Sequence, residues 1–329
     1  MRVFITGITG LLGNNVARLL TQRGDNVVAL VRSEPKPEVL EGIRVELVRG
    51  ELIDSPETSK AIAGCEAVIH SAALIHLGWT RTDESMKVNR DGTVAMADMA
   101  FRHQKRFVHI GTVNTIPVAT DGVPSDEETP TTDVNAQVPC DYVISKRASV
   151  EVVMERVARG LDAVIVHPGF MLGPYDWKPS SGRMMLELSK GFKPGWPVGG
   201  CSICDARDVA AGVISAMDRG QVGRHYVLAG ENVTYKVLWT EMMQLMGKPK
   251  PLVPIGPMLR AVAGRVGDLS ARITGHETDI NSAGVKMSSQ LHWHSSDRAR
   301  AELGYSTRSR QETLADCAKW IRERFLEKA

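Results

Sequence analysis

Glycines at positions 7, 10 and 13 constrain this chain more than any other feature, because they join a run of strand formers to a run with helical spacing. Residues 3–5 predict a strand, and residues 11–20 predict a helix that ends at Gly24. A strand that enters a helix through a glycine turn directs free N–H groups and the helix dipole at one point, which suits a pyrophosphate. The alternative is that the glycines serve the turn alone. The residues that we expect to bind a dinucleotide here are Gly7, Thr9, Gly10, Leu11, Leu12 and Gly13.

A second motif, Tyr142-Val143-Ile144-Ser145-Lys146, offers an acid–base pair far downstream. Tyr142 and Lys146 are four residues apart, so on a helix they share one face and their polar ends approach each other. An adjacent ammonium favours the phenolate and lowers the pKa of tyrosine from its usual value of about 10. The pair therefore predicts a tyrosine that serves as acid or base. The alternative is that Tyr142 is a half-buried core residue and Lys146 a solvated one, without a catalytic role. The glycine turn upstream favours the catalytic interpretation.

The length and charge of the chain limit its class. A chain of 329 residues predicts about two domains, and 40 basic against 38 acidic residues give a net charge of +2 without a long basic run. We therefore expect no nucleic-acid partner. The first strand begins at residue 2, and no apolar run reaches the roughly 18 residues of a membrane helix. These features predict a cytoplasmic protein with no membrane partner.

Five scattered cysteines argue against a disulfide scaffold. Cys201 and Cys204 form a CxxC pair, but a zinc site would need a second ligand pair, for which only His292 and His294 are candidates. A redox pair is expected where a helix begins, whereas this one follows two glycines. We expect ordinary thiols beside a strand and no metal site.

Short apolar runs alternate with helical stretches as far as residue 168, which predicts an α/β fold with a Rossmann-type doubly wound parallel sheet. The predicted strands are 27–31, 45–48, 67–70, 107–110 and 163–166. A polar loop at 126–139 should cover the carboxyl ends of these strands. Beyond 200 we expect a helix at 205–216, a strand at 225–228, a helix at 235–246, a Pro-rich stretch at 249–257 and a final helix from 312. The predicted domains are an NAD(P)-binding domain, 1–168 plus about 205–229, and a smaller, mostly C-terminal substrate-binding domain, about 169–204 plus 230–329.

Further motifs follow in a fixed order: Gly50-Glu51-Leu52, His70-Ser71-Ala72-Ala73, Val88-Asn89-Arg90-Asp91-Gly92-Thr93, His167-Pro168-Gly169 with Gly173-Pro174, and Arg207-Asp208-Val209-Ala210. With the two motifs above, this series resembles the extended short-chain dehydrogenase/reductases, which include the NAD-dependent epimerase/dehydratases. The nearest branch is the dihydroflavonol-4-reductase-like proteins. The resemblance covers nearly the whole chain.

The resemblance implies a third catalytic residue, a Ser or Thr after the fifth strand that hydrogen-bonds the substrate carbonyl. This position falls on Thr112, with Thr115 as a fallback, and a strand cap is the alternative role for Thr112. Asn89 matches an asparagine that supports a proton-relay water. The resemblance also implies cofactor contacts from Glu51, Leu52, Ser71, Ala72, Ala73, Tyr142, Lys146, His167, Pro168 and Gly169.

Three of these positions depart from the family pattern. Glu51 replaces the usual aspartate near the adenine, and His167 replaces a common arginine. Gly169 stands where sugar-nucleotide epimerases usually have an asparagine, which weakens a sugar-nucleotide assignment.

The choice of cofactor depends on the end of the second strand. NAD would need an acidic residue about 20 positions after the glycines, but Arg32 lies nineteen after Gly13. A guanidinium can hold a 2′-phosphate bidentately, so we favour NADP(H), with NAD(H) as the alternative. A plain surface arginine is the structural alternative.

The resulting hypothesis is an NADPH-dependent oxidoreductase that reduces a ketone or aldehyde of a small apolar or aromatic molecule, with Tyr142 as proton donor. A sugar-nucleotide epimerase or dehydratase with tightly held NAD is the second hypothesis, and a non-catalytic NADP sensor is the third. The resemblance suggests a monomer or homodimer. The candidate substrate contacts are His76, Trp79, Thr112, Val113, Cys140, Met171, Tyr175, Trp177 and Trp196.

Overall fold

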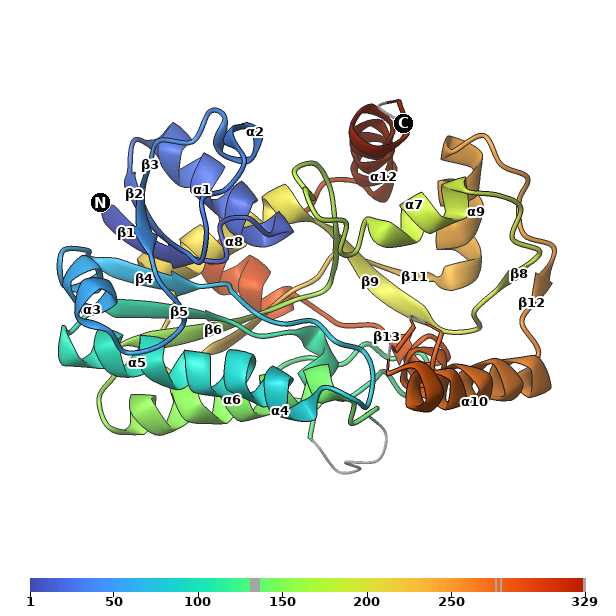
Figure 1. Cartoon of the computed structure of the whole chain (residues 1–329), viewed down its shortest axis with the longest axis horizontal. Coiled ribbons are helices and arrows are strands. Elements are labelled where there is room, and N and C mark those ends of the chain that lie inside the picture. Colours follow the sequence, from blue (N-terminus) through green and yellow to red (C-terminus); the bar gives the residue numbers. More distant parts are fainter. Residues whose placement is uncertain (131–136, 276, 279, 328–329) are drawn as a thin grey trace.

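The computed structural model describes residues 1–130, 137–275, 277–278 and 280–327, so part of the predicted loop at 126–139 lies outside the described residues. Its main element is a seven-stranded sheet of order β10-β6-β5-β4-β1-β2-β3, in which every neighbouring pair is parallel (Figure 1). The predicted doubly wound sheet is therefore confirmed. Its strands are β1 (Arg2–Thr6), β2 (Asn26–Val31), β3 (Val45–Arg49), β4 (Ala67–His70), β5 (Arg106–Ile110), β6 (Ala163–Pro168) and β10 (His225–Leu228).

Helices cover both faces of this sheet because successive strand residues point to opposite sides. On one face, α1 (Leu11–Arg23) and α8 (Ala206–Arg219) pack on a buried cluster that includes Val3, Ile5 and Val108. On the other, α3 (Pro56–Ala63), α5 (Gly92–Arg102) and α6 (Asp141–Ala158) pack on a cluster that includes Phe4 and Phe107. Figure 1 shows the sheet between these two helical layers.

The strand order reverses at β1, which pairs with β2 on one side and β4 on the other. The connections that leave the carboxyl ends of β1 and β4 therefore diverge, and such a switch point is where open α/β sheets bind their ligands. The glycine turn begins at this point, directly after Thr6.

A second, smaller set of elements follows β6. Here β7 (Phe170–Leu172), β9 (Gly200–Asp205), β11 (Glu231–Thr234) and β13 (Leu291–His292) form a four-stranded sheet, and β8 (Gly195–Trp196) pairs with β12 (Val253–Pro254). The helices α7 (Arg183–Ser189), α9 (Tyr235–Leu245) and α12 (Arg310–Ile321) share a separate buried cluster with β9. Cys201 and Cys204 lie buried within β9, and burial raises the pKa of both thiols, to about 12 for Cys201. The division into two domains stays a prediction.

The predicted helices at 205–216 and 235–246 correspond to α8 and α9, and the final helix is α12, which continues as a π-helical segment, Arg322–Leu326. The sequence did not predict α10 (Pro257–Thr274) or α11 (Ser282–Met287). In the described residues, no helix is long and apolar enough to cross a membrane. The remaining short elements are α2 (Pro37–Leu40), α4 (Thr82–Ser85), the π-helical η1 (Met86–Asp91) and η4 (Ala299–Leu303), and the 3-10 helix η2 (Val113–Thr115).

Candidate active site

Two of the three glycines in the turn are required by the protein's own packing. Gly7 has a φ of 81°, and a Cβ there would lie 2.8 Å from the backbone nitrogen of Ala72. A Cβ on Gly13 would lie 2.2 Å from the carbonyl oxygen of Gly7, so α1 could not approach β1 as closely. Gly7 and Gly13 therefore fix the shape of the turn.

Gly10 is different, because neither its backbone angles nor its neighbours require a glycine. Its φ is −88°, and a Cβ would meet only the Gly7 carbonyl oxygen, at 3.4 Å. No side chain caps α1 at this position, and its first turn has no acidic residue. The residues present thus fit the pyrophosphate of a dinucleotide, since Gly10 leaves the space and α1 supplies the positive end of a helix.

A buried histidine that the sequence analysis did not assign holds the neighbouring strand end in place. His70 Nδ1 lies 2.8 Å from Thr6 Oγ1, and His70 Nε2 lies 3.1 Å from Thr93 Oγ1. The Thr6 hydroxyl also accepts a hydrogen bond from the backbone N–H of Ala72, at 3.1 Å. Burial lowers the pKa of His70 to about 3, so the imidazole is neutral at physiological pH. The predicted cofactor segment 71–73 is therefore tied to β1 and α5.

Two arginines lie at the carboxyl ends of β2 and β3. Arg32 follows Val31, which lies opposite Arg49 in the sheet register. Both arginines are exposed, and within the described part of the chain neither forms a hydrogen bond or ion pair. Glu51 is exposed after β3, whereas Leu52 packs against α5, where a Cβ on Gly92 would touch it at 3.0 Å. This edge therefore presents two cations that have no partner among the described residues.

The structure brings together the three residues predicted to be catalytic. Tyr142 and Lys146 lie in the first two turns of α6, and Thr112 follows β5. The Thr112 side chain hydrogen-bonds the Tyr142 hydroxyl, and Lys146 Nζ donates to the Ile110 carbonyl oxygen at 2.5 Å. All three side chains belong to buried residues, with exposures of 6%, 9% and 2% for Thr112, Tyr142 and Lys146. The arrangement can orient and protonate a carbonyl oxygen.

The predicted lowering of the Tyr142 pKa is wrong for this structure. Burial raises the pKa of Tyr142 to about 12, although the hydrogen bond from Thr112 acts in the opposite direction. Burial also lowers the pKa of Lys146 to about 7, because the ammonium has lost its water. Desolvation of both groups thus outweighs the attraction expected from their spacing.

Asn89 lies in the π-helical segment η1 and is 1% exposed. Its amide donates to the Leu74 carbonyl oxygen and to Ser145 Oγ, both at 2.9 Å, and its oxygen accepts from the Leu74 N–H at 2.7 Å. Both amide hydrogens are thus used by the protein, and the side chain ties the start of segment 74–82 to α6. The role in a proton relay stays a prediction.

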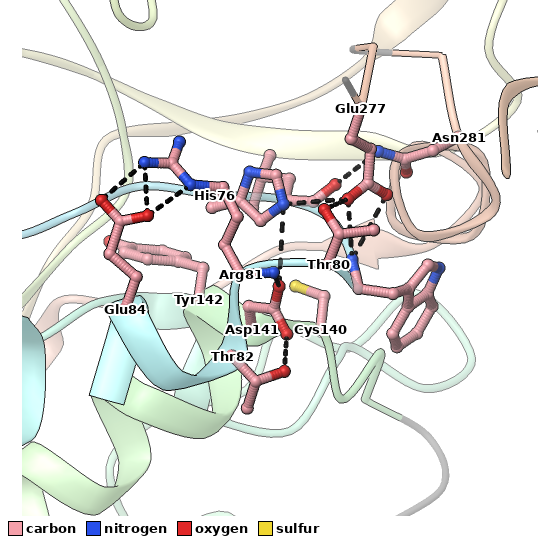
Figure 2. Close-up of polar contacts among 12 residues, drawn as sticks. His76, Thr80, Arg81, Thr82, Glu84, Cys140, Asp141, Tyr142, Glu277 and Asn281 are labelled. Carbon is pink, nitrogen blue, oxygen red and sulfur yellow. Dashed lines mark hydrogen bonds and ion pairs between the residues drawn. The ribbon is translucent and has the colours of Figure 1, made fainter. Parts of the chain in front are cut away.

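Segment 74–82, which follows residues 71–73 and ends at the first residue of α4, is held over the start of α6 from two sides (Figure 2). From α6, the Asp141 carboxylate accepts the Arg81 N–H at 2.8 Å and the Thr82 hydroxyl at 2.5 Å, while the Tyr142 N–H donates to the His76 carbonyl. From the opposite side, Glu277 Oε2 lies 2.9 Å from His76 Nε2. The predicted substrate contact His76 is therefore held beside Tyr142 by two carboxylates, since Asp141 Oδ2 lies 3.6 Å from the same nitrogen.

Among the residues that hold segment 74–82, Glu277 has the largest set of partners. The sequence analysis did not identify Glu277. Its carboxylate accepts hydrogen bonds from the Trp79 N–H and, at 2.7 Å, from the Thr80 hydroxyl, and its side chain is only 2% exposed. Burial acts to raise the pKa of Glu277, but the hydrogen bonds from Thr80, Trp79 and His76 outweigh it and leave the pKa lowered. The carboxylate is therefore ionised at neutral pH.

Glu277→Ala is expected to release segment 74–82, because three donors would lose their acceptor. Hydrogen–deuterium exchange of this segment should become faster by at least about tenfold, which corresponds to about 1.4 kcal/mol. Glu277→Gln keeps the acceptor oxygen and is the matched control. Because the folded pKa is lowered, the part of the protection that depends on the charge should be fully present above the unfolded pKa and be lost as the pH falls through the folded value. Unchanged exchange in the alanine variant would mean that Glu277 does not hold the segment.

The other predicted substrate residues do not share one site but pack in different parts of the protein. Cys140 is fully buried beside Tyr142, with Sγ 4.0 Å from Met287 Sδ. Trp79 donates from Nε1 to Ser282 Oγ at 2.9 Å and is 36% exposed. Val113 packs in a small cluster with Ile116, Val227 and Ala229, and Met171 packs beneath α8. Their substrate roles stay predictions.

Three predicted aromatic residues lie in the second set of elements. Tyr175 and Trp177 pack against Trp320, with ring centroids 5.2 and 4.8 Å away. Arg18 also covers the Tyr175 ring, 3.7 Å from its centroid, and Trp196 in β8 lies 5.4 Å from the Lys236 ammonium. Much of this aromatic surface is thus used in packing.

His167 lies between the Thr112 carbonyl and His225 of β10. Its Nδ1 lies 3.1 Å from the Thr112 carbonyl oxygen and its Nε2 lies 3.0 Å from His225 Nδ1. These two histidines border a cavity of about 170 Å³ whose lining residues do not include Tyr142 or Lys146. Pro168 ends β6, and Gly169 is confined, since a Cβ would lie 2.6 Å from the Ser202 carbonyl oxygen.

A doubly wound parallel sheet with a glycine turn at its switch point defines the class of nucleotide-binding Rossmann proteins. Residues 3–229 match the model of the NAD dependent epimerase/dehydratase family. The chain therefore belongs to this family and is an NAD(P)-dependent enzyme of the extended short-chain dehydrogenase/reductase class.

Full-length relatives agree with this assignment. The chain is 31% identical over 329 residues to "Sterol demethylase protein B" of Methylococcus capsulatus, covering 98% of this chain and 99% of the relative. It is 30% identical to the Synechocystis protein named "Putative dihydroflavonol 4-reductase", covering 97% and 94%. The solved structure of gox2253 superposes with a TM-score of 0.84 at 31% identity and covers 98% of both chains.

Proposed function

We propose that this protein is an NADPH-dependent reductase that converts a ketone or aldehyde of an apolar molecule into an alcohol. The observation that carries the proposal is the buried group of Thr112, Tyr142 and Lys146 near the carboxyl edge of the sheet. A pKa of about 12 keeps Tyr142 protonated at physiological pH, which suits a residue that must donate a proton. The reductase name of one relative and the sterol name of another support the reaction and the apolar substrate class.

The glycine turn, segment 71–73 and the arginines at the carboxyl ends of β2 and β3 would hold the cofactor. When bound, NADPH supplies the hydride that reduces the carbonyl carbon. Thr112 hydrogen-bonds the carbonyl oxygen and holds it near the Tyr142 hydroxyl. As the oxygen gains negative charge, Tyr142 donates its proton, and the protonated form of Lys146 stabilises the phenolate that remains.

The reaction class is tested by incubating the purified protein with NADPH and a panel of ketones and aldehydes of increasing apolar size. Loss of the reduced-nicotinamide absorbance together with formation of the matching alcohol is expected. Turnover of a nucleotide-sugar without net consumption of NADPH would contradict the proposal.

Arg32→Ala is expected to weaken NADPH binding by about tenfold to a hundredfold and to leave NADH binding unchanged. The reason is that Arg32 is exposed and unpaired among the described residues, so its guanidinium is available to the 2′-phosphate. Titrations of nicotinamide fluorescence with each cofactor measure the effect. Arg44→Ala, a change of another exposed arginine in the loop before β3, is the control. An equal loss of affinity for NADPH and NADH would contradict the assignment of Arg32 to the 2′-phosphate.

The second candidate function is a sugar-nucleotide epimerase or dehydratase, which the family description itself favours. Such an enzyme would retain NAD through purification and use the same Tyr142 and Lys146. Release of NAD from the denatured protein, in a ratio near one per chain, would move the assignment to this function. The predicted homodimer and the two-domain division remain part of the proposal.

A further inference from the structure

Helix α10 exposes to solvent the large apolar face that a surface helix normally buries. Such helices usually bury their large apolar residues. In α10 the buried residues are Gly264, Gly267 and Ala271, and a Cβ on Gly267 would lie 1.7 Å from the Ile280 carbonyl oxygen. The opposite face carries six large apolar side chains, each 52–80% exposed, which we call the apolar stripe: Met258, Leu259, Val262, Val266, Leu269 and Ile273. At about 100° per residue these positions fall within one arc of the helix that points directly away from the protein.

Exposed apolar side chains continue beyond the apolar stripe. Residues 252–253 precede α10 and Ile280 follows it, and all are more than half exposed. Segment 74–82 is bonded to this region through Trp79, whose Nε1 donates to Ser282, and it adds Ile75 at 59% exposure. Exposed apolar side chains are therefore present both on α10 and on the segment that lies over Tyr142. Figure 1 shows α10 at one edge of the molecule.

Cationic side chains border the apolar stripe. Arg265 and Arg272 are exposed on one side of it, and neither forms a hydrogen bond or ion pair with the residues that the structure describes. Lys286 lies nearby, with its ammonium 5.9 Å from the Trp79 ring. The single carboxylate of α10, on Asp268, already accepts the Ser282 N–H at 2.9 Å. Among the described residues, α10 therefore offers no free carboxylate of its own to pair with these arginines.

We propose that α10 docks this protein on an anionic lipid bilayer, with the apolar stripe among the acyl chains and Arg265 and Arg272 at the level of the lipid phosphates. A helix with a wide apolar face bordered by cations lies in the plane of such an interface. Trp79 has the amphipathic ring that favours the same depth. A second copy of this chain would match the apolar stripe but would set the same arginines against each other. A bilayer supplies both apolar chains and negative charge, and this proposal replaces the expectation of no membrane partner.

Docking would place the membrane beside the active site. After α10 the chain reaches Glu277, which holds His76 over the start of α6. An apolar substrate dissolved in the bilayer would then enter next to Tyr142. This delivery rests on the proposed reductase function, whereas the docking itself does not, because it needs neither cofactor nor catalysis.

Sedimentation with lipid vesicles tests the docking on the full chain. The vesicles are phosphatidylcholine mixed with phosphatidylglycerol, and phosphatidylcholine alone. The stripe variant carries Val262→Ser, Val266→Ser and Leu269→Ser at exposed positions, so the fold should be kept, which circular dichroism checks. Val123→Ser and Val222→Ser, at 65% and 57% exposure away from α10, form the matched control. The role of charge is tested with a double variant, Arg265→Glu and Arg272→Glu, which we call the glutamate pair. Its control, the lysine pair, carries Arg265→Lys and Arg272→Lys and keeps both positive charges.

The expected result is sedimentation of the wild type with the anionic vesicles and weaker sedimentation with phosphatidylcholine alone. The stripe variant should lose at least about tenfold in partition coefficient, and the glutamate pair should lose its preference for anionic vesicles. The valine control and the lysine pair should bind as the wild type does. Failure of the wild type to bind, or wild-type binding by the stripe variant, overturns the proposal. A dimer in light scattering that the stripe variant abolishes, without vesicle binding, would assign the face to a second copy.

Discussion

Tyr142→Phe is expected to reduce turnover by about a thousandfold and to leave the affinity for NADPH unchanged. The change removes one oxygen atom, and with it the proton donor that Thr112 holds in place. Because the ring remains, its packing against Val138, Cys140 and Met287 should be kept. Single-turnover rates with saturating cofactor, together with fluorescence titration, separate the chemical step from binding.

Tyr305→Phe is the matched control for this substitution. The Tyr305 hydroxyl is buried and has no hydrogen-bond partner among the described residues, so its removal should be harmless to activity and folding. If Tyr142→Phe retained wild-type turnover, another group would have to supply the proton, and the proposed mechanism would be wrong.

Gly13→Ala and Gly10→Ala are expected to fail in different ways. A Cβ on Gly13 would overlap the Gly7 carbonyl oxygen, so this variant should lose about 3 kcal/mol of unfolding free energy as well as cofactor binding. A Cβ on Gly10 has room within the protein, so this variant should fold with nearly unchanged stability and still lose most of its affinity for NADPH. Thermal unfolding and fluorescence titration of both variants distinguish packing from ligand approach.

Gly247→Ala serves as a reference for the intrinsic cost of a glycine substitution, because a Cβ there meets no atom but the φ is 67°. Normal NADPH binding by Gly10→Ala would show that no phosphate approaches the backbone at this position. This result would also contradict the assignment of the cofactor site to the glycine turn.

The sequence predicted the main sheet because its signals are local. The apolar runs at 67–70 and 225–228 became β4 and β10 at the predicted residues. Buried parallel strands consist of continuous apolar runs, so each one is visible without knowledge of its neighbours. The glycine turn was predictable for the same reason, since its strand, turn and helix are contiguous.

Helix α10 escaped prediction because its pattern of burial is unusual. Its inner face uses glycine and alanine where a helix normally has leucine or isoleucine, and glycine lowers helix propensity. Its large apolar residues have helical spacing, but the Pro-rich stretch before it concealed the start. Proline at the first helical position is in fact a favourable start, and Pro257 occupies that position.

The candidate site was predictable only in part. Tyr142 and Lys146 share a helix, so their proximity follows from their spacing, and Thr112 was reached through the family resemblance. Their pKa values were not predictable, because they depend on how completely the fold removes water from both groups. Glu277 was not found because no local pattern connects a loop carboxylate with a histidine 201 positions earlier.

That separation along the chain has a consequence for biosynthesis. The bonds that join His76 to Glu277 and Leu77 to Asn281 close loops of more than 200 residues. Closing such loops is entropically costly, and a chain emerging from the ribosome forms its N-terminal structure first. The strands β1 to β6 can therefore assemble while segment 74–82 still lacks its C-terminal partners. We expect catalytic competence to be the last property that the nascent chain acquires, after its sheet has formed.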